Sequence, residues 1–246
     1  MMSDDIKDTL YQKVTNKLHA AGQQQGITEA AKYISQSLEK EGWIYAFGTG
    51  HSHMMAEEIF YRAGGLARVR PILDPKLMLH ENAETSTDFE RDEGKSQEYL
   101  GSYQFTDVDT LIIASNSGRN GAVIDMALSA KAKGSKVIGL TNLKHSKSVD
   151  SRHSSGNRLF EVADVTLDNF GEIGDASLKI QGDELRMAPT STITGSFILH
   201  LVLSLAVEDL LQKGKTPEVF KSSNIDSSEE HNSILIKKYK HRIKGL

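Results

Sequence analysis

The stretch from residue 109 to residue 142, DTLIIASNSGRNGAVIDMALSAKAKGSKVIGLTN, decides how this chain folds. An apolar run leads into a loop of serine and asparagine, helical sequence follows, and a glycine separates that helix from a second apolar run. These five segments lie at 110–114, 115–120, 121–133, 134 and 137–140. Strand, polar loop, helix, glycine and strand in this order predict a right-handed βαβ unit on a parallel sheet.

The same order of elements occurs earlier in the chain. The apolar run 43–47 ends at a glycine, which is typical of a strand buried on both faces, and helical sequence from Ser52 to Ala63 stops at Gly64. Further strands are predicted at 67–73 and 160–166. Further helices are predicted at 5–21, 27–41, 190–211 and 228–243. The chain is therefore expected to be α/β, with long polar loops at 74–94 and 141–158.

Composition excludes several classes of protein. The net charge is −4 and the lysines are scattered, so the chain lacks the basic surface of a nucleic-acid-binding protein. Cysteine is absent from the sequence, which excludes disulfides, thiolate metal sites and cysteine nucleophiles. No run of about 18 apolar residues and no signal peptide is evident. We expect a cytoplasmic protein that does not bind membranes.

Two polar loops follow predicted strands, where ligands bind in open parallel sheets. The first is Gly48-Thr49-Gly50-His51-Ser52 and the second is Ser115-Asn116-Ser117-Gly118-Arg119-Asn120. Glycines let the backbone approach an anion, and a helix N-terminus after each loop offers free N–H groups. Either loop alone could simply cap its helix. Together they predict a site for a phosphomonoester and sugar hydroxyls; the phosphate-loop and dinucleotide glycine motifs are absent.

These residues resemble the SIS (sugar isomerase) domain family, whose second loop reads S-x-S-G before a helix and a strand of V-I-x-L-T type. The resemblance spans roughly residues 40–210. It implies a three-layer αβα fold with a five-stranded parallel sheet, in one domain of 246 residues with N-terminal helices at 5–41 and a helical extension at 212–246. The tail at 216–239 resembles bacterial SIS proteins of uncharacterised activity.

The resemblance also implies which residues bind the ligand. Ser52, Ser115, Ser117 and Asn120 would contact phosphate or sugar hydroxyls. The complete predicted phosphosugar site consists of Gly48, Gly50, His51, Ser52, Ser115, Asn116, Ser117, Gly118 and Asn120. Where glucosamine-handling members carry threonine and an acidic residue after S-x-S-G, this chain has Arg119-Asn120, which disfavours glucosamine 6-phosphate as the ligand.

The stretch 52–65, SHMMAEEIFYRAGG, is similar to phosphoheptose isomerases, in which a glutamate on the helix after the first loop acts as a base. Glu57 or Glu58 would be that residue here, and His200 on the later long helix would be its partner. A carboxylate and an imidazole can move the protons of an aldose–ketose isomerisation near neutral pH. If the loop around residues 80–94 folds over the ligand, Glu81 or Glu90 is an alternative base.

His51 and His53 also suggest a metal site, with Glu57, His80, Glu81 or Glu84 as a third ligand. The spacing favours no such set, and we expect the two histidines to line the pocket or cap a helix, without a metal or other cofactor.

Three functions remain open from the sequence. The leading one is a phosphosugar isomerase; the others are a non-catalytic sugar-phosphate sensor acting through a protein partner, and a lyase or etherase acting on an amino-sugar phosphate. Relatives commonly complete the pocket across a subunit interface, so we expect a homodimer or homotetramer with the site near that interface.

Overall fold

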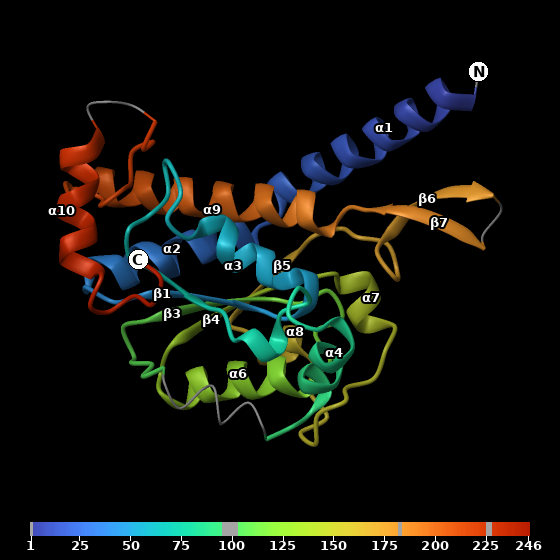
Figure 1. Cartoon of the computed structure of the whole chain (residues 1–246), viewed down its shortest axis with the longest axis horizontal. Helices are drawn as coiled ribbons and strands as arrows, with labels where there is room; N and C mark the ends of the chain where they lie inside the picture. Colours follow the sequence, from blue (N-terminus) through green and yellow to red (C-terminus); the bar gives the residue numbers. More distant parts are fainter. Residues whose placement is uncertain (1, 95–102, 182–183, 225–227) are drawn as a thin grey trace.

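The fold is built on a five-stranded parallel sheet, as the computed structural model shows for residues 2–94, 103–181, 184–224 and 228–246 (Figure 1). The strand order is β2-β1-β3-β4-β5, and every neighbouring pair is parallel. The strands are β1 (Ile44–Gly48), β2 (Val69–Ile72), β3 (Thr110–Ala114), β4 (Lys136–Thr141) and β5 (Val165–Asp168). This sheet confirms the predicted α/β class.

Side chains alternate between the two faces of the sheet, as a period of two residues requires. Trp43, Tyr45 and Phe47 point into one apolar core, whereas Ile44 and Ala46 point into the other. All five residues of β1 and all five of β3 are buried. Near-continuous apolar runs are what strands covered on both faces need.

Helices cover both faces, which gives three layers (Figure 1). Helices α2 (Gly26–Glu39), α3 (Met54–Ile59) and α9 (Ser191–Gln212) lie on one face. Helices α6 (Gly121–Ala132) and α8 (Leu159–Val162) lie on the other. Helix α9 has the length and mean hydropathy of 1.6 to cross a membrane, the only such helix in the described part of the chain, yet it packs along α2 with its buried side chains in the core.

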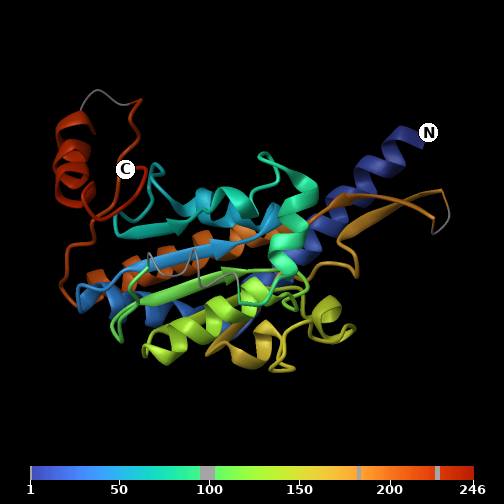
Figure 2. The ribbon, with the colours of Figure 1, turned by 60° about the horizontal axis from the view of Figure 1, so that its bottom comes forward.

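Smaller elements surround the two ends of the sheet. Near the carboxyl ends of the strands lie the short helices η1 (Gly50–His53), η2 (Pro75–Leu77), α4 (Ala83–Arg91) and α7 (Leu143–Lys147). Helix α1 (Met2–Gln23) and a hairpin of β6 (Ala176–Gln181) and β7 (Leu185–Pro189) extend away from the body on that side (Figure 1). Helix α10 (Glu229–Tyr239) lies at the opposite end (Figure 2).

Several predicted boundaries are wrong. The strand predicted at 160–166 begins only at Val165, because Leu159 and Val162 lie three residues apart on one buried face and form a helical turn. The helix predicted at 52–63 is confined to Met54–Ile59. The loops 74–94 and 141–158 contain helices, and the hairpin was not predicted.

The backbone at Glu41 and Gly42 explains why α2 ends before residue 41. Glu41 has a φ of 62°, which a helix does not allow, and a Cβ atom on Gly42 would lie 2.1 Å from the carbonyl oxygen of Val108. Only glycine fits where the chain passes this close to the β3 strand start.

Candidate functional site

Strand register brings the two predicted loops together. Gly48 is the register partner of Ala114, and Ala114 is the partner of Leu140, so the loops after β1, β3 and β4 begin side by side. Figure 2 shows the strands running toward the same side of the molecule. Two adjoining hollows of about 310 and 280 Å³ lie there and share lining residues, so we treat them as one cleft. The shared residues are His51, Ser52, Ser115, Asn116, Gly174 and Asp175.

The first loop depends on its glycines. A Cβ atom on Gly48 would lie 2.3 Å from the carbonyl oxygen of Ser52, so no other residue allows the loop to fold back on the strand. Gly50 has a φ of 56°, in the left-handed region. The Ser52 amide donates to the carbonyl of Thr49 at 3.0 Å, which closes the turn. Loop 1, residues 48–52, thereby presents Ser52 to the cleft.

Two hydrogen bonds fix the shape of the second loop, one within the loop and one to Leu159. The Ser115 hydroxyl accepts a hydrogen bond from the amide of Gly118 at 3.1 Å, and the carbonyl of Gly118 accepts one from the amide of Leu159 at 2.7 Å. Gly118 has a φ of 57°, and a Cβ there would lie 3.0 Å from the Leu159 side chain. Ser115 and Gly118 therefore shape loop 2, residues 115–120, while Ser117 lines the cleft.

The hydroxyls of Ser52 and Ser117 are free to bind a ligand. Neither makes a hydrogen bond within the residues that the structure describes, and both line the cleft. The N-cap positions of η1 and α6, Thr49 and Asn120, likewise form no side-chain cap. The two serine hydroxyls and the two N-cap side chains therefore do not cap η1 or α6.

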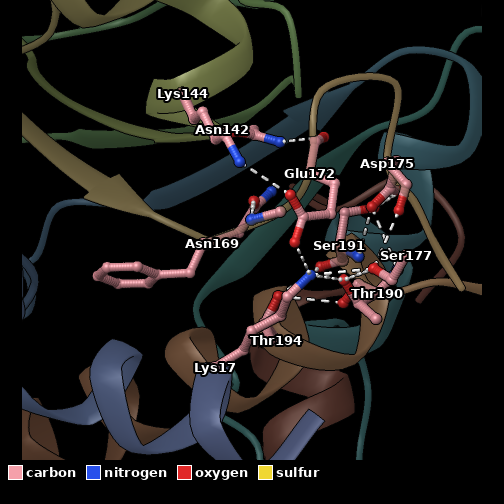
Figure 3. A network of polar contacts seen from close by, with 12 residues as sticks. Lys17, Asn142, Lys144, Asn169, Glu172, Asp175, Ser177, Thr190, Ser191 and Thr194 are labelled. Carbon is pink, nitrogen blue, oxygen red and sulfur yellow. Dashed lines mark hydrogen bonds and ion pairs between the residues drawn. The ribbon is translucent and has the colours of Figure 1, made fainter. Parts of the chain in front are cut away.

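Hydrogen bonds hold Asn116 in the wall of the cleft, and its neighbours Asn142, Asn169 and Asp175 can be followed in Figure 3. The backbone carbonyl of Asn116 accepts bonds from the hydroxyl of Thr141 and the amide of Asn142 at 3.1 and 3.2 Å. The Asn116 side-chain oxygen accepts a bond from Asn169 at 2.6 Å, and its NH₂ donates to Asp175 at 3.4 Å. Asn116, which follows β3, is therefore held by residues at the end of β4 and by residues that follow β5.

Asp175 occupies the N-terminus of α9. Its Oδ1 accepts the amides of Thr190 and Ser191 at 3.1 and 3.0 Å, and its Oδ2 accepts the Ser191 hydroxyl. A carboxylate at this end of a helix is stabilised by the free N–H groups and the helix dipole. Asp175 has a φ of 68°, a strained conformation for a residue with a side chain, and such strain is concentrated at functional sites.

A buried lysine on α1, Lys17, forms hydrogen bonds next to the N-terminus of α9 (Figure 3). Lys17 donates to the hydroxyls of Ser177 and Thr190 at 3.0 and 2.8 Å, and its Nζ lies 3.9 Å from Glu172. Burial lowers the pKa of Lys17, although Glu172 opposes that shift. Glu172, which lines the cleft, also binds Lys144 at 2.9 Å, and this hydrogen bond lowers the pKa of the Glu172 carboxyl.

Asn120 lies beside the cleft and does not line it. Its NH₂ donates to Glu90 at 2.5 Å and its oxygen accepts a bond from Arg152 at 3.0 Å. Glu90 itself lines the cleft, and its second oxygen would lie 3.8 Å from a Cβ on Gly50. This carboxylate thus lies between the two loops, on helix α4, within the segment 74–94 that was predicted to be a loop.

The Glu58–His200 pair forms, but away from the cleft. Glu58 Oε1 lies 2.8 Å from His200 Nε2, and Glu58 Oε2 accepts a bond from Arg62 at 2.9 Å. His200 lines a separate hollow of about 200 Å³ with Arg62 and Leu203. Glu57 has an exposed side chain and lies 3.8 Å from His53. Neither glutamate is among the residues that line the cleft within this chain.

The two histidines of loop 1 differ in their surroundings. His51 lines the cleft, whereas His53 is buried and contacts the carbonyl of Gly50. The His53 and His80 rings are 5.8 Å apart. No group of three or more His, Asp or Glu side chains suited to a metal ion occurs within the described ranges.

Sequence analysis missed the part of the cleft that follows β4 and β5. Asn142, His145, Asn169, Glu172 and Asp175 all line it. The rule that located loops 1 and 2 would have found Asn142 and Asn169, since each follows a strand. Asp175, seven residues beyond β5, reaches the cleft only through tertiary packing.

Comparisons with known proteins agree with this architecture. Residues 10–142 match the SIS domain family. A UPF0309 protein of Thermoanaerobacter pseudethanolicus is 45% identical over 243 residues, which cover 97% of this chain and 98% of that protein. A phosphoheptose isomerase from Francisella tularensis gives a TM-score of 0.54 at 18% identity, over 85% of this chain and 100% of that chain.

A second solved structure gives a similar result. The Vibrio vulnificus NanR protein, complexed with ManNAc-6P, gives a TM-score of 0.53 at 18% identity, over 96% of this chain and 72% of that chain. At 18% identity the two solved structures show only a similar fold. The sequence matches, in contrast, show that this chain is related to the family. The resemblance seen in the sequence is thereby confirmed, and the chain belongs to the SIS domain family and, within it, to the UPF0309 proteins.

Proposed function

We propose that this chain binds a phosphorylated sugar in the cleft between loops 1 and 2 and interconverts its aldose and ketose forms. One observation supports the proposal most strongly: two serine hydroxyls without partners in the described chain, on loops more than sixty residues apart in sequence, line one cleft at the carboxyl ends of the strands. The SIS family and its phosphoheptose isomerase neighbour are consistent with this ligand class.

The phosphate group belongs at the end of the cleft nearest α6. Three carboxylates, those of Glu90, Glu172 and Asp175, line the cleft, and no lysine or arginine lines it in the described part of the chain. Arg152 lies next to loop 2: its guanidinium donates to Asn120 at 3.0 Å, and its amide donates to the carbonyl of Arg119 at 2.8 Å. Burial and then the charge of Arg119 lower the pKa of Arg152, whereas Glu90 opposes this shift. We place the phosphate dianion beside Ser117, near these two arginines.

Isomerisation needs a group that removes a proton beside the carbonyl and a group that moves protons between oxygens. Glu90 is the carboxylate placed between the two loops, so we assign the base to it within one chain. Burial and then Arg119 lower the pKa of His145, which favours the neutral form of this cleft imidazole, and we assign to it the transfer of protons between oxygens. Glu58 and His200 remain the alternative pair, for a cleft completed by a second subunit.

Ligand binding can be tested by thermal shift with pentose, hexose, heptose and amino-sugar phosphates. A ligand at about 100 times its dissociation constant stabilises a protein by about 2.7 kcal/mol. The proposal predicts a shift with a sugar phosphate that is absent with the unphosphorylated sugar. Ser233→Ala, on α10 away from the cleft, is the matched control for Ser52→Ala and Ser117→Ala. Equal shifts in all three variants would contradict the site.

Turnover is tested separately with the sugar that binds. Glu90→Gln should retain binding and lose most of its isomerase activity, because the amide cannot accept the proton. Glu58→Gln should keep its activity if one chain supplies the base. The reverse result would return the assignment to Glu58 and His200.

A sensor is the second candidate, favoured by the position of Glu58 and His200 outside the cleft. It predicts the same thermal shift without interconversion of the bound sugar, as judged by NMR of the recovered ligand. We also propose, as the sequence suggested, a cytoplasmic homodimer or homotetramer, which light scattering would test.

A further inference from the structure

The opposite end of the sheet holds a cluster of arginines around a single indole ring. Trp43 immediately precedes β1, and the guanidinium groups of Arg68, Arg70 and Arg242 lie 5.2, 5.4 and 5.3 Å from the centre of its ring. Arg68 and Arg70 come from the start of β2, whereas Arg242 follows α10. Segments distant in sequence thus converge on Trp43, which is buried.

These guanidinium groups lack acidic partners. Arg70 donates to the phenol oxygen of Tyr45 at 2.8 Å, and Arg68 donates to the backbone carbonyl of Glu41. The Nε of Arg68 is buried with no hydrogen-bond partner. No carboxylate of the described residues lies within 4.0 Å of a guanidinium nitrogen of these three arginines. Cation–π contacts hold the arginines in place without neutralising them.

The nearby acids are already engaged. Asp109 accepts the amide of Trp43 at 2.7 Å through one oxygen and the amide and hydroxyl of Thr106 through the other. Glu218 is bound by Lys238 and Tyr239, and these hydrogen bonds lower its pKa even though burial opposes the shift. Arg68 also lowers the pKa of Glu218 through its charge, and the exposed Glu41 lies beside the cluster, but none of these carboxylates hydrogen-bonds to the three guanidinium groups within the described residues.

Two hollows open beside this cluster. One, of about 320 Å³, is lined by Trp43, Arg70 and Arg242 and also by the acidic residues Glu41 and Asp109. The other, of about 400 Å³, is lined by Arg68, Lys215 and Lys238 together with Glu39, Glu41 and Glu218. Both have the size of a small-molecule site. They lie at the amino ends of the strands, across the sheet from the cleft.

We propose that this arginine cluster, Arg68, Arg70 and Arg242 around Trp43, binds a small anion that bears two or more negative charges, such as a diphosphate or a polycarboxylate. Guanidinium groups bind phosphate and carboxylate oxygens in a bidentate manner, and here two of them face one hollow. A bound anion would give these guanidinium groups the direct acidic partners that the described residues do not supply. The proposal is independent of the ligand and chemistry assigned to the cleft.

The sequence provides a direct probe, because Trp43 is the only tryptophan in the chain. Inorganic pyrophosphate is titrated into the protein at constant ionic strength, maintained with chloride, while the tryptophan emission is recorded. The proposal predicts a saturable change in emission. An equal change on adding chloride alone would reflect charge screening and would overturn the proposal, as would the absence of any saturable change.

Variants locate the response. Arg70→Gln with Arg242→Gln should weaken pyrophosphate binding about tenfold or more, since each guanidinium makes charge-assisted hydrogen bonds. Arg242→Ala alone, which changes an exposed side chain after α10, tests the same point with little risk to folding. Arg62→Gln removes an arginine elsewhere and should leave binding unchanged. Undiminished binding in both cluster variants, or equal weakening in Arg62→Gln, would refute the site.

The two ends of the molecule can be separated with Ser117→Ala. This variant lies in the cleft and should keep the full tryptophan response to pyrophosphate. If the response is lost in Ser117→Ala and kept in the arginine variants, pyrophosphate binds in the cleft and the arginine site is wrong. If pyrophosphate binds as proposed while no sugar phosphate shifts the melting temperature, the arginine site stands and the proposed function falls.

Discussion

The two ends of the parallel sheet use different chemistry toward an anion. At the carboxyl ends, the cleft offers serine hydroxyls and the N-termini of helices, with carboxylates in its walls. At the amino ends, where helix C-termini face the solvent, three guanidinium groups surround Trp43. Helix dipoles favour anions at the first end and cations at the second. The two proposed sites therefore differ in kind: the one in the cleft would bind a phosphosugar without a lining arginine, whereas the one at the amino end would depend on arginines.

The largest effect on sugar-phosphate binding is expected from Gly48→Ala, which displaces loop 1. Gly48→Ala places a Cβ 2.3 Å from the carbonyl of Ser52, so loop 1 must move, and overpacking of this kind costs about 1–3 kcal/mol. We expect sugar-phosphate binding to be lost while the Trp43 response to pyrophosphate remains. Gly22→Ala, whose Cβ would lie 3.6 Å from Phe197, is the control and should retain binding in calorimetry.

Ser117→Ala should have the next largest effect. Loss of a hydrogen bond to a charged phosphate costs about 1.5–3 kcal/mol, which weakens binding roughly 10- to 150-fold. Calorimetric titration with the sugar phosphate found by thermal shift measures this loss. An unchanged dissociation constant would remove Ser117 from the site.

Asp175 tests whether the α9 N-terminus depends on an internal carboxylate. Asp175→Ala removes the acceptor of two amides and a hydroxyl and should lower the free energy of unfolding by about 1–2 kcal/mol. Asp175→Asn should cost less, because asparagine tolerates a positive φ and still accepts a hydrogen bond. Urea denaturation of both variants gives the comparison, and equal stability of wild type and Asp175→Ala would contradict the capping role.

A smaller effect depends on pH. The hydrogen bond from Lys144 holds the pKa of Glu172 below its usual 4.5 in the folded state. Its contribution to stability is therefore present above pH 4.5 and is lost as the pH falls through the folded-state pKa. Because this pair is partly exposed, the contribution is about 1 kcal/mol or less. Unfolding curves of Glu172→Gln should approach those of the wild type in acid and lie below them at pH 7.

The smallest effect is expected at Glu57, whose carboxylate is exposed and 3.8 Å from His53. Glu57→Gln should change the free energy of unfolding by no more than about 0.5 kcal/mol and leave both ligands bound. If Glu57→Gln alone lost isomerase activity, Glu57, one of the two bases predicted from the sequence, would replace Glu90 as the assigned base.

Much of the fold could be predicted because local patterns agree with the tertiary structure. Buried runs such as 110–114 have strand length and end at turn residues, and Gly42 and Gly134 mark places where the chain must turn. The prediction failed at Leu159–Val162, where four residues fit a strand or a helical turn equally well and packing against α6 decides. The hairpin of β6 and β7 gave no comparable signal.

The site could be predicted only where it follows strands. Loops 1 and 2 lie together because Gly48 and Ala114 are neighbours in the sheet, whereas the order of strand and loop along the chain implies only that both loops lie at the same edge. The sequence predicted Glu57 or Glu58 as the partner of His200, and in the structure Glu58 Oε1 lies 2.8 Å from His200 Nε2. Their distance from the cleft was not predictable, because it depends on where along α3 and α9 the two helices cross.

The most direct test of the central claim is amide NMR of the labelled protein during titration with the sugar phosphate that stabilises it most. The account predicts the largest shift changes at the backbone amides of loops 1 and 2, with the indole N–H of Trp43 unmoved. Changes centred on Trp43 and Arg70, with loops 1 and 2 unaffected, would contradict it and place the sugar phosphate at the other end of the sheet.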